Sequence, residues 1–291
     1  MDRNGIYFEG LVRPRRLRAR RELSKPVSSL IPATSGADDF FSTLCELVPV
    51  ALESYRLSAL RRRVPACLRV LGVQSPQEAC LRLAERPELA GRLLDVVLLG
   101  VTEFFRDPEV FEFLGRTVLV EWAEKPRPRR IWSAACSSGQ ELYSLAMCVH
   151  ARGLLRETEL VGSDCRAAAV EAARTGVYPV IELETVPRRW CAEYFEVDGS
   201  FAEIARVLRN RARWEISDLL CETLPGPWDM VLYRNMSIYL DAATADQVWR
   251  RVIAELAPGG ILITGRADHP PEELPLRRLV SCVYQKEESH D

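Results

Sequence analysis

WDMVLYRNMSIYL, residues 228–240, joins a buried strand to a polar end. An apolar run at residues 230–232 is typical of a strand. A phenol, a guanidinium and an amide follow it, ending at Asn235, before the chain turns apolar again ahead of Tyr239. Open parallel sheets bind small molecules beyond the carboxyl ends of their strands. The stretch therefore predicts a strand of an α/β sheet that ends at a ligand.

Strands and helices alternate on both sides of this stretch, from about residue 126 onwards. The expected strands are RRIWSAA (129–135), ELVGSD (159–164), RARWEISDL (211–219), WDMVLYRN (228–235), ILITG (261–265) and a last one, RRLVSCVYQKE (277–287). The expected helices between them are QELYSLAMCVHARG (140–153), CRAAAVEAARTG (165–176) and ATADQVWRRVIAELAPGG (243–260). Such alternation predicts a doubly wound α/β sheet with mostly parallel strands.

The N-terminal part has a different pattern. Residues 1–37 form an arginine-rich stretch and a turn-rich connector, which we expect to be a basic, flexible arm. Residues 38–115 place apolar residues three and four apart, which indicates a small helical domain. Within it, Ser75 and Glu78 form a capping box that begins a helix. The remaining residues, 116–291, are expected to form the α/β domain.

Composition excludes several classes of protein. A formal net charge of −2 argues against a general nucleic-acid binder. The sequence has no apolar run of the roughly 20 residues that a membrane span needs. Its first residues lack the basic-then-apolar order of a signal peptide, so we expect no such segment. The nine cysteines have no metal-binding spacing, so we expect reduced thiols, no metal site and a cytoplasmic location.

Polar groups end four of the expected strands. The first strand leads into SAACSSGQE (133–141), whose small residues allow a ligand to approach the backbone, although the G-x-G-x-x-G fingerprint of dinucleotide sites is missing. Asp164, Asp218 and Asn235 end the next three. A carboxylate at position 164 suits the two hydroxyls of a ribose, but it could equally cap the helix that follows. Together the four ends favour a ligand shaped like a nucleoside.

Five stretches, in order along the chain, resemble motifs of the chemotaxis receptor methyltransferase family, CheR. They are GVTEFFRDPEVFEFL (100–114), RIWSAACSSGQELYSLAM (130–147), VGSDCRAAAVEAARTGVYP (161–179), WDMVLYRNMSIYLDAAT (228–244) and LAPGGILITG (256–265). The resemblance implies a helical domain followed by a Rossmann-like methyltransferase domain. It also implies transfer of a methyl group from S-adenosylmethionine (SAM) to glutamate side chains of chemoreceptors, leaving S-adenosylhomocysteine (SAH).

The resemblance also implies roles for individual residues. The cofactor-binding positions that it assigns are Thr102, Arg106, Ala135, Glu141, Asp164, Asp218, Leu219, Arg234 and Asn235. Among them, Glu141 would bind the ammonium group of SAM, and Asp164 its ribose. Arg106 and Tyr239 are the candidate catalytic residues, which would grip and aim the acceptor carboxylate. Without the resemblance, Arg106 could be a helix cap and Tyr239 a core aromatic.

The chain departs from the family pattern at several positions. Gly100 replaces an asparagine, Gln140 a glutamate and Leu142 a proline, Asp218 stands for an asparagine, and GRAD (265–268) replaces G-H-S-E. Pro65 interrupts RRVPACL (62–68), which aligns with the basic helix that contacts the receptor in relatives. We therefore expect a monomer that meets an acidic receptor helix through Arg61, Arg62, Arg63 and the N-terminal arm. The segment YFEVDGSFAEIARV (194–207) is shorter than in relatives that dock on a receptor tether, which favours a tether-independent enzyme.

Two other functions stay open on the sequence. One is a methyltransferase of the same fold with another carboxylate or hydroxyl acceptor. The other is a non-catalytic regulatory protein that binds SAM or SAH. The departures at Gly100, Gln140 and GRAD favour these two, whereas Glu141, Asp164, Arg106 and Tyr239 favour the receptor enzyme.

Overall fold

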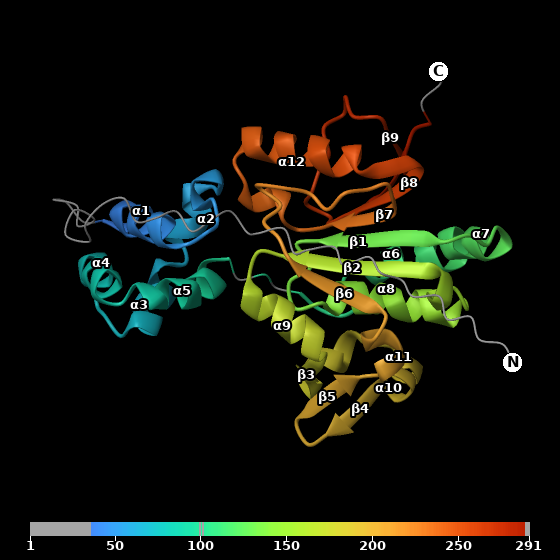
Figure 1. Cartoon of the computed structure of the whole chain (residues 1–291), viewed down its shortest axis with the longest axis horizontal. Coiled ribbons are helices and arrows are strands. Elements are labelled where there is room, and N and C mark those ends of the chain that lie inside the picture. Colours follow the sequence, from blue (N-terminus) through green and yellow to red (C-terminus); the bar gives the residue numbers. More distant parts are fainter. Residues whose placement is uncertain (1–35, 99, 101, 289–291) are drawn as a thin grey trace, which may run out of the picture.

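The computed structural model describes residues 36–98, 100 and 102–288, so the arm expected at residues 1–37 lies almost wholly outside the described residues. Short helices form the N-terminal part, which we call the helical part, and it packs beside one end of an α/β sheet (Figure 1). Its helices are α1 (Ala37–Leu47), α2 (Leu57–Arg61), α3 (Val64–Leu71), α4 (Pro76–Glu85) and α5 (Ala90–Val97).

The capping box expected at the start of α4 forms only in part. Ser75 is the N-cap, and its side chain accepts a hydrogen bond from the Glu78 amide at 3.2 Å, but the Glu78 carboxylate accepts from the Gln74 amide at 2.9 Å and not from Ser75. Residues 57–71 form two helices, α2 and α3, and not one continuous helix. Pro65 stands in the first turn of α3, where its missing N–H has no carbonyl partner to lose.

The sheet has seven strands in the order β6-β2-β1-β7-β8-β10-β9. Their bounds are β1 (Arg129–Ala134), β2 (Thr158–Asp164), β6 (Ala212–Ile216), β7 (Trp228–Tyr233), β8 (Leu256–Thr264), β9 (Leu276–Val280) and β10 (Val283–Lys286). The first five run parallel, and β10 is antiparallel to both of its neighbours. The predicted doubly wound fold is confirmed, and its strand order reverses between β1 and β7.

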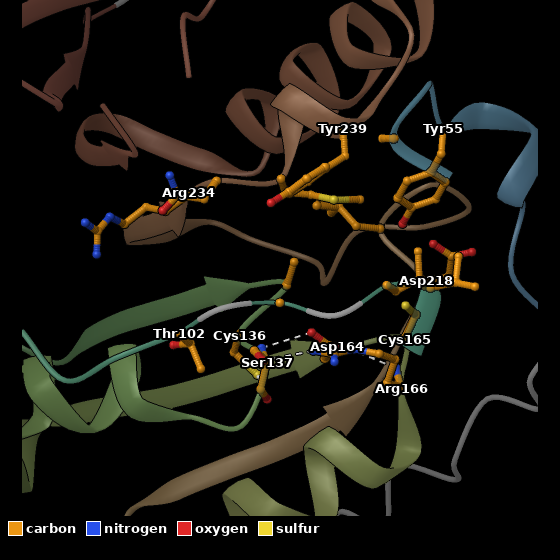
Figure 2. A pocket seen from close by; sticks show the side chains of 18 of the residues that line it. Tyr55, Thr102, Cys136, Ser137, Asp164, Cys165, Arg166, Asp218, Arg234 and Tyr239 are labelled. Carbon is orange, nitrogen blue, oxygen red and sulfur yellow. Dashed lines mark hydrogen bonds and ion pairs between the residues drawn. The ribbon is translucent and has the colours of Figure 1, made fainter. Parts of the chain in front are cut away.

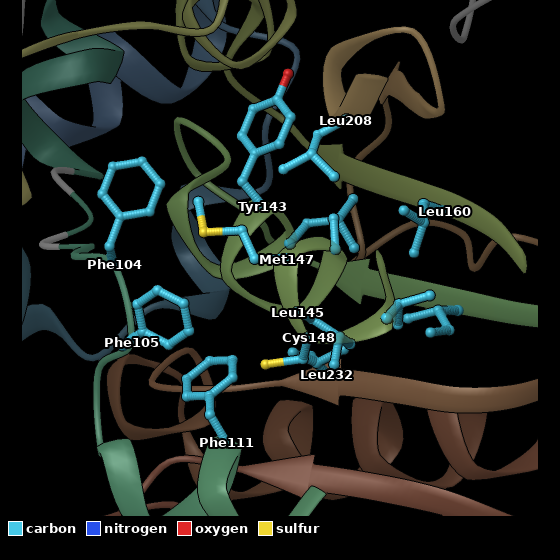
Figure 3. Close-up of a cluster of buried hydrophobic side chains, with 14 of the residues drawn as sticks. Phe104, Phe105, Phe111, Tyr143, Leu145, Met147, Cys148, Leu160, Leu208 and Leu232 are labelled. Carbon is cyan, nitrogen blue, oxygen red and sulfur yellow. The ribbon is translucent and has the colours of Figure 1, made fainter. Parts of the chain in front are cut away.

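Helices cover both faces of the sheet. Helices α8 (Gln140–Ala151) and α9 (Ala167–Thr175) pack on one face, and α12 (Ala242–Ala254) packs on the other (Figure 1). Successive residues of β7 point to opposite faces, as the period of a strand requires. Leu232 therefore joins the cluster that contains Tyr143 and Met147 of α8 (Figure 3), whereas Val231 joins a cluster that continues into the helical part.

The remaining elements surround this core. After the helical part come α6 (Pro108–Phe113), a π turn (Leu114–Val118) and α7 (Leu119–Glu124). A second, antiparallel sheet of β3 (Val177–Pro179), β5 (Phe201–Ile204) and β4 (Phe195–Asp198), with α10 (Arg188–Tyr194) and α11 (Arg206–Arg209), follows α9. The sequence patterns did not predict this small sheet.

Two predictions at the C-terminal end are wrong. The single strand expected at 277–287 is a hairpin, because Cys282 adopts a left-handed backbone (φ 64°) that turns the chain between β9 and β10. Helix α12 ends at Ala254 rather than near Gly260, since β8 already begins at Leu256.

Two absences follow for the part of the chain that the structure describes. None of its helices is both long and apolar enough to cross a bilayer. It also brings together no group of three or more His, Cys, Asp or Glu side chains that could hold a metal ion. All nine cysteines are free thiols.

Candidate active site

A cavity of about 430 Å³ lies at the carboxyl ends of β1, β2 and β7, beside the point where the strand order reverses. Its volume falls in the range of small-molecule sites, and its position is the one that open α/β sheets use for ligands. The helical part closes one side of it through Tyr55, Arg62 and Arg63. All ten candidate residues line this cavity: Thr102, Arg106, Ala135, Glu141, Asp164, Asp218, Leu219, Arg234, Asn235 and Tyr239.

The turn between β1 and α8 forms the floor of the cavity. Ala135 and Ser137 both hold left-handed backbone conformations, with φ of 59° and 52°. Such conformations cost non-glycine residues on the order of 1–3 kcal/mol and tend to cluster at ligand sites. Gly139 completes the turn at φ 91°, and a Cβ there would lie 2.7 Å from the Trp214 ring. The turn is thus held in one tight path beside the cavity.

Asp164 connects this turn to the end of β2. Its carboxylate accepts hydrogen bonds from the Ser137 amide at 2.9 Å and from the Arg166 amide at 3.0 Å (Figure 2). Arg166, 8% exposed, also donates from Nε to Asp164 at 3.1 Å and from Nη2 to the Ser137 hydroxyl at 2.9 Å. The N-cap position of α9 is Arg166, so the alternative of Asp164 as the helix cap is wrong.

Gly100, one of the departures from the family pattern, lies beside Ser137 and Arg166. A Cβ at this position would lie 3.2 Å from the Ser137 hydroxyl, which is a tight contact, and 3.4 Å from Arg166 Nη2, which is an ordinary one.

Arg234 is the buried centre of the opposite wall. Its side chain is 2% exposed and pairs with Asp107 at 2.6 Å and with Glu141 at 3.1 Å. It also donates to the carbonyl oxygens of Arg106 at 2.8 Å and Thr264 at 3.3 Å. Through these contacts the Arg234 guanidinium, at the end of β7, links the end of β8 to α8 and to the segment before α6. One Glu141 oxygen accepts from Arg234, and the other accepts from Ser133 Oγ at 2.8 Å.

The side chains of the segment TEFFR, residues 102–106, are divided between the hydrophobic core and the cavity. Phe104 and Phe105 are buried (Figure 3). The Phe105 amide donates to Ser144 Oγ at 2.9 Å. Thr102 and Arg106 line the cavity instead. Helix α6 begins at Pro108 with Asp107 in the N-cap position, so Arg106 is not its N-cap. Tyr239 is half-buried at the cavity and lies across from Asp164 and Ser137 (Figure 2).

The far end of the cavity contains Asp218 and Leu219. Burial raises the pKa of the Asp218 carboxyl, which also accepts a hydrogen bond from the Leu220 amide at 2.9 Å. Tyr55 of the helical part lies at the same end (Figure 2). Glu141 and Asp218 thus lie towards the two ends of the cavity with Asp164 between them, and Glu103 is a fourth acidic residue of its lining.

Two further departures have local partners. Gln140 donates from Nε2 to Glu182 at 2.8 Å and accepts from Ser138 Oγ at 2.9 Å, so a glutamate here would face a second carboxylate. Asp268, the last residue of GRAD, is 2% exposed and accepts from the amides of Asn235 and Gly265 and from Ser237 Oγ. This acidic residue fixes the loop after β7.

Sequence reasoning missed several residues of this site. Tyr55, Ser137 and Arg166 line the cavity, and Asp107 and Asp268 hold its walls. For Ser137 the signal was the small-residue turn itself. Arg166 and Tyr55 gave no signal in the sequence.

The strand order of this sheet is typical of SAM-dependent methyltransferases. So is a cavity that lies where the strand order reverses and has carboxylates at three points along it. Residues 100–282 match the family described as "CheR methyltransferase, SAM binding domain". The chain belongs to the CheR methyltransferase family.

Full-length relatives agree with this assignment. Over 234 residues the chain is 30% identical to chemotaxis protein methyltransferase 2 of Pseudomonas aeruginosa, covering 78% of this chain and 83% of the relative. The chemotaxis protein methyltransferase of Listeria monocytogenes is 27% identical over 238 residues, or 81% and 91% of the two chains. That of Salmonella typhimurium is 28% identical over 251 residues, or 80% and 84%.

The residues of the cavity fit SAM, whose bound sulfonium supplies an electrophilic methyl group. SAM carries an ammonium group and a sulfonium charge, and carboxylates are the natural partners of cations. The Arg234 guanidinium, which could repel the ammonium group, is already paired with Asp107 and Glu141. Carboxylate oxygens accept about four hydrogen bonds in total, so Glu141 and Asp164 keep capacity for a ligand.

Proposed function

We propose that this enzyme transfers the methyl group of SAM to glutamate side-chain carboxylates on the acidic helices of a chemoreceptor. The observation that supports the acceptor class is the presence of Arg106 and Tyr239 on the same cavity as Glu141 and Asp164. A guanidinium grips a carboxylate at two points, and a phenol adds one hydrogen bond. Membership of the CheR family makes a chemoreceptor the natural source of that carboxylate.

The cofactor roles in this proposal are those that the family resemblance implies, and the positions of the polar groups in the cavity support them. Glu141 binds the ammonium group, and Asp164 binds the ribose. Asp218 and Leu219 hold the adenine at the far end. Thr102, Ala135 and Asn235 line the path between these groups, while Arg234 keeps Glu141 in place. This set extends the cofactor contacts over the whole length of the cavity.

For this reaction the protein mainly has to align the acceptor oxygen with the methyl group of SAM. A glutamate carboxylate has a pKa near 4.3, so it is already a nucleophile at neutral pH and needs no general base. The leaving group is neutral, so no acid is required. Holding two reactants in line is worth up to roughly 7–11 kcal/mol. Arg106 and Tyr239 would supply this alignment for the acceptor oxygen.

The receptor would approach over the basic rim of the cavity. Arg62 and Arg63 line the cavity from the junction of α2 and α3. Arg61 instead pairs with Asp38, through two hydrogen bonds of 2.5 and 2.9 Å. We therefore assign first contact with an acidic helix to Arg62 and Arg63, with Arg61 and the arm as outer contacts. We also propose that the enzyme acts as a monomer and divides near residue 115 into a helical and a methyltransferase domain.

Methyl-ester formation tests this proposal directly. With methyl-labelled SAM and a chemoreceptor cytoplasmic fragment, the label should appear on the fragment and be released as methanol by mild alkali. Arg106→Ala should lower turnover at least tenfold, and Tyr239→Phe should cost about 1–2 kcal/mol of barrier, the value of one hydrogen bond. Arg92→Ala, an exposed arginine of α5, is the matched control and should retain full turnover.

Two outcomes would overturn the proposal. Label that resists alkali would indicate an ether or amine product, and therefore another acceptor. Tight binding of SAH without any transfer would indicate a regulatory protein.

A further inference from the structure

A three-residue segment of the helical part lies against the chain that follows Tyr239. The Arg56 amide donates to the Tyr239 carbonyl at 2.8 Å, and the Asp241 amide donates to the Ser54 carbonyl at 3.1 Å. The two segments form an antiparallel bridge, and Arg56 Nε donates to the Leu240 carbonyl at 2.7 Å. We call residues 54–56 the strap.

The loop that carries Tyr239 is held at both ends. At its start, the Asp268 carboxylate accepts from the Asn235 amide and from Ser237 Oγ. Between the ends, Ser237–Tyr239 form one 3₁₀ turn, which is too short to hold its place by its own hydrogen bonds. At its end, the strap binds the main chain of Tyr239 itself. The sheet thus fixes the beginning of the loop, and the helical part fixes the residue whose side chain faces the cavity.

We propose that Arg56 is a positioning residue for methyl transfer, which acts by holding the main chain of Tyr239 so that its phenol stays aimed at the acceptor. The proposal rests on the role assigned to Tyr239 under the proposed function. Arg56 is exposed and is not among the residues that line the cavity. Its effect should therefore appear in turnover and not in cofactor affinity.

The backbone of Arg56 allows its two contacts to be removed separately. Its φ of −58° is the value that proline requires, and Tyr55 before it is extended (φ −91°, ψ 146°), as a residue before proline must be. Arg56→Ala removes the guanidinium alone, whereas Arg56→Pro also removes the amide donor. With saturating SAM and a chemoreceptor cytoplasmic fragment, we expect kcat to fall about three- to tenfold in the first variant and further in the second. The affinity for SAH, measured by calorimetry, should stay within about twofold in both.

Ala205→Pro is the matched control. Ala205 is also an N-cap with proline-compatible φ (−56°), and its amide donates to the Tyr194 carbonyl at 2.8 Å, away from the cavity. The control loses one main-chain hydrogen bond between elements, which is the same main-chain loss as in Arg56→Pro, and should keep the wild-type kcat. An equal loss of kcat in both variants would mean that general loosening, and not the strap, causes the effect.

A double-mutant cycle with Tyr239→Phe separates the possible failures. If the strap acts through the Tyr239 phenol, Arg56→Pro should change kcat less than about twofold in the Tyr239→Phe background. The same fold-loss in both backgrounds, or full turnover of Arg56→Pro, would overturn the strap alone. Full turnover of Tyr239→Phe in the wild-type background would overturn the proposed role of Tyr239, and with it the catalytic role of the strap.

Discussion

Asp164 has a counterpart at the opposite end of the sheet. Asp229, near the start of β7, is also a buried carboxylate that accepts from a main-chain amide, that of Arg130 at 2.8 Å, and pairs with arginines. Both carboxylates are buried, and each has a main-chain amide and an arginine among its partners. They differ in location. Asp164 borders the cavity, whereas Asp229 is not among the cavity-lining residues.

This pair provides a residue-scale prediction about the cofactor. Asp164→Asn should weaken SAH binding by about 1–3 kcal/mol, because a ribose partner is lost in a buried site. Asp229→Asn should lower the stability to unfolding without changing SAH affinity. Calorimetry with SAH and urea unfolding of both variants measure the two effects. Unchanged SAH affinity in Asp164→Asn would leave this residue with a purely structural role between Ser137 and Arg166.

Asp218 gives a prediction about pH. Burial raises the pKa of its carboxyl above the ordinary value of 3.8. The folded protein therefore holds this proton more tightly than the unfolded chain, and the group destabilises the fold as pH rises from about 3.8 through the raised pKa. If the adenine amino group donates to Asp218, SAH binding favours the ionised form. Affinity should then increase with pH across the same interval, with release of a proton.

The test compares wild type with Asp218→Asn. Calorimetry in two buffers of different ionisation enthalpy should show proton release on SAH binding only in the wild-type protein. Because Glu141 and Asp164 are present in both proteins, the difference isolates position 218. Identical pH dependence in the two proteins would remove Asp218 from the adenine site.

Reasoning from strand ends located Asp164, Asp218 and Asn235, and the family resemblance supplied the other candidates. All ten line one cavity. Both missed residues whose importance arises from tertiary contact. Arg166 matters because it joins Asp164 to Ser137, and Asp268 because it reaches Asn235 from a loop 33 residues away. Neither contact leaves a pattern in the sequence.

At the scale of elements, long periodic segments were predictable and short ones were not. Strands β1, β2 and β7 were expected within a few residues of their observed bounds, because buried parallel strands are continuous apolar runs. The three-stranded sheet was missed because β3, β4 and β5 have only three or four residues each and leave side chains such as Val197 and Phe201 exposed. The C-terminal hairpin was read as one strand because its turn contains no glycine or proline.

Pro65 supplies the prediction at this scale. Because it stands in the first turn of α3, Pro65→Ala should change the free energy of unfolding by no more than about 1 kcal/mol. Val70→Pro, at an exposed position later in the same helix, should cost about 3 kcal/mol or more, since it removes a helical hydrogen bond. Urea unfolding measures both. A gain of about 3 kcal/mol in Pro65→Ala would place the proline inside a continuous helix.

At the scale of the molecule, the arrangement of the helical part against the sheet could not be predicted. The strap joins residues 184 positions apart, and the cluster around Val231 runs from the sheet into α1–α5 without a break. This arrangement also places Arg62 and Arg63 at the cavity, although the basic helix expected from the family is interrupted in the sequence.

The basic rim predicts a dependence on salt. Arg62→Glu with Arg63→Glu should lower kcat/KM for an acidic receptor fragment at low ionic strength, and the deficit should shrink as salt shortens the field to about 8 Å at physiological strength. SAH affinity should stay nearly unchanged, since neither residue is assigned a cofactor contact. Arg86→Glu, an exposed arginine of the same part that pairs with Glu88, is the control. A deficit that does not respond to salt would argue against electrostatic docking.

The pH profile of turnover decides the nature of the acceptor. An ionised carboxylate needs alignment but no base, so kcat at saturating SAM should be flat between about pH 6 and 9 and fall only as the acceptor is protonated, below about pH 5. Saturating SAM matters, because titration of Asp218 affects cofactor binding at acid pH and would otherwise add its own limb. Initial rates quenched in acid avoid loss of the ester in alkaline samples. A hydroxyl or amine acceptor must lose a proton to react, so its rate would rise steeply from pH 7 to 9. That rise would contradict the carboxylate mechanism and leave Arg106 and Tyr239 to be explained by a different substrate.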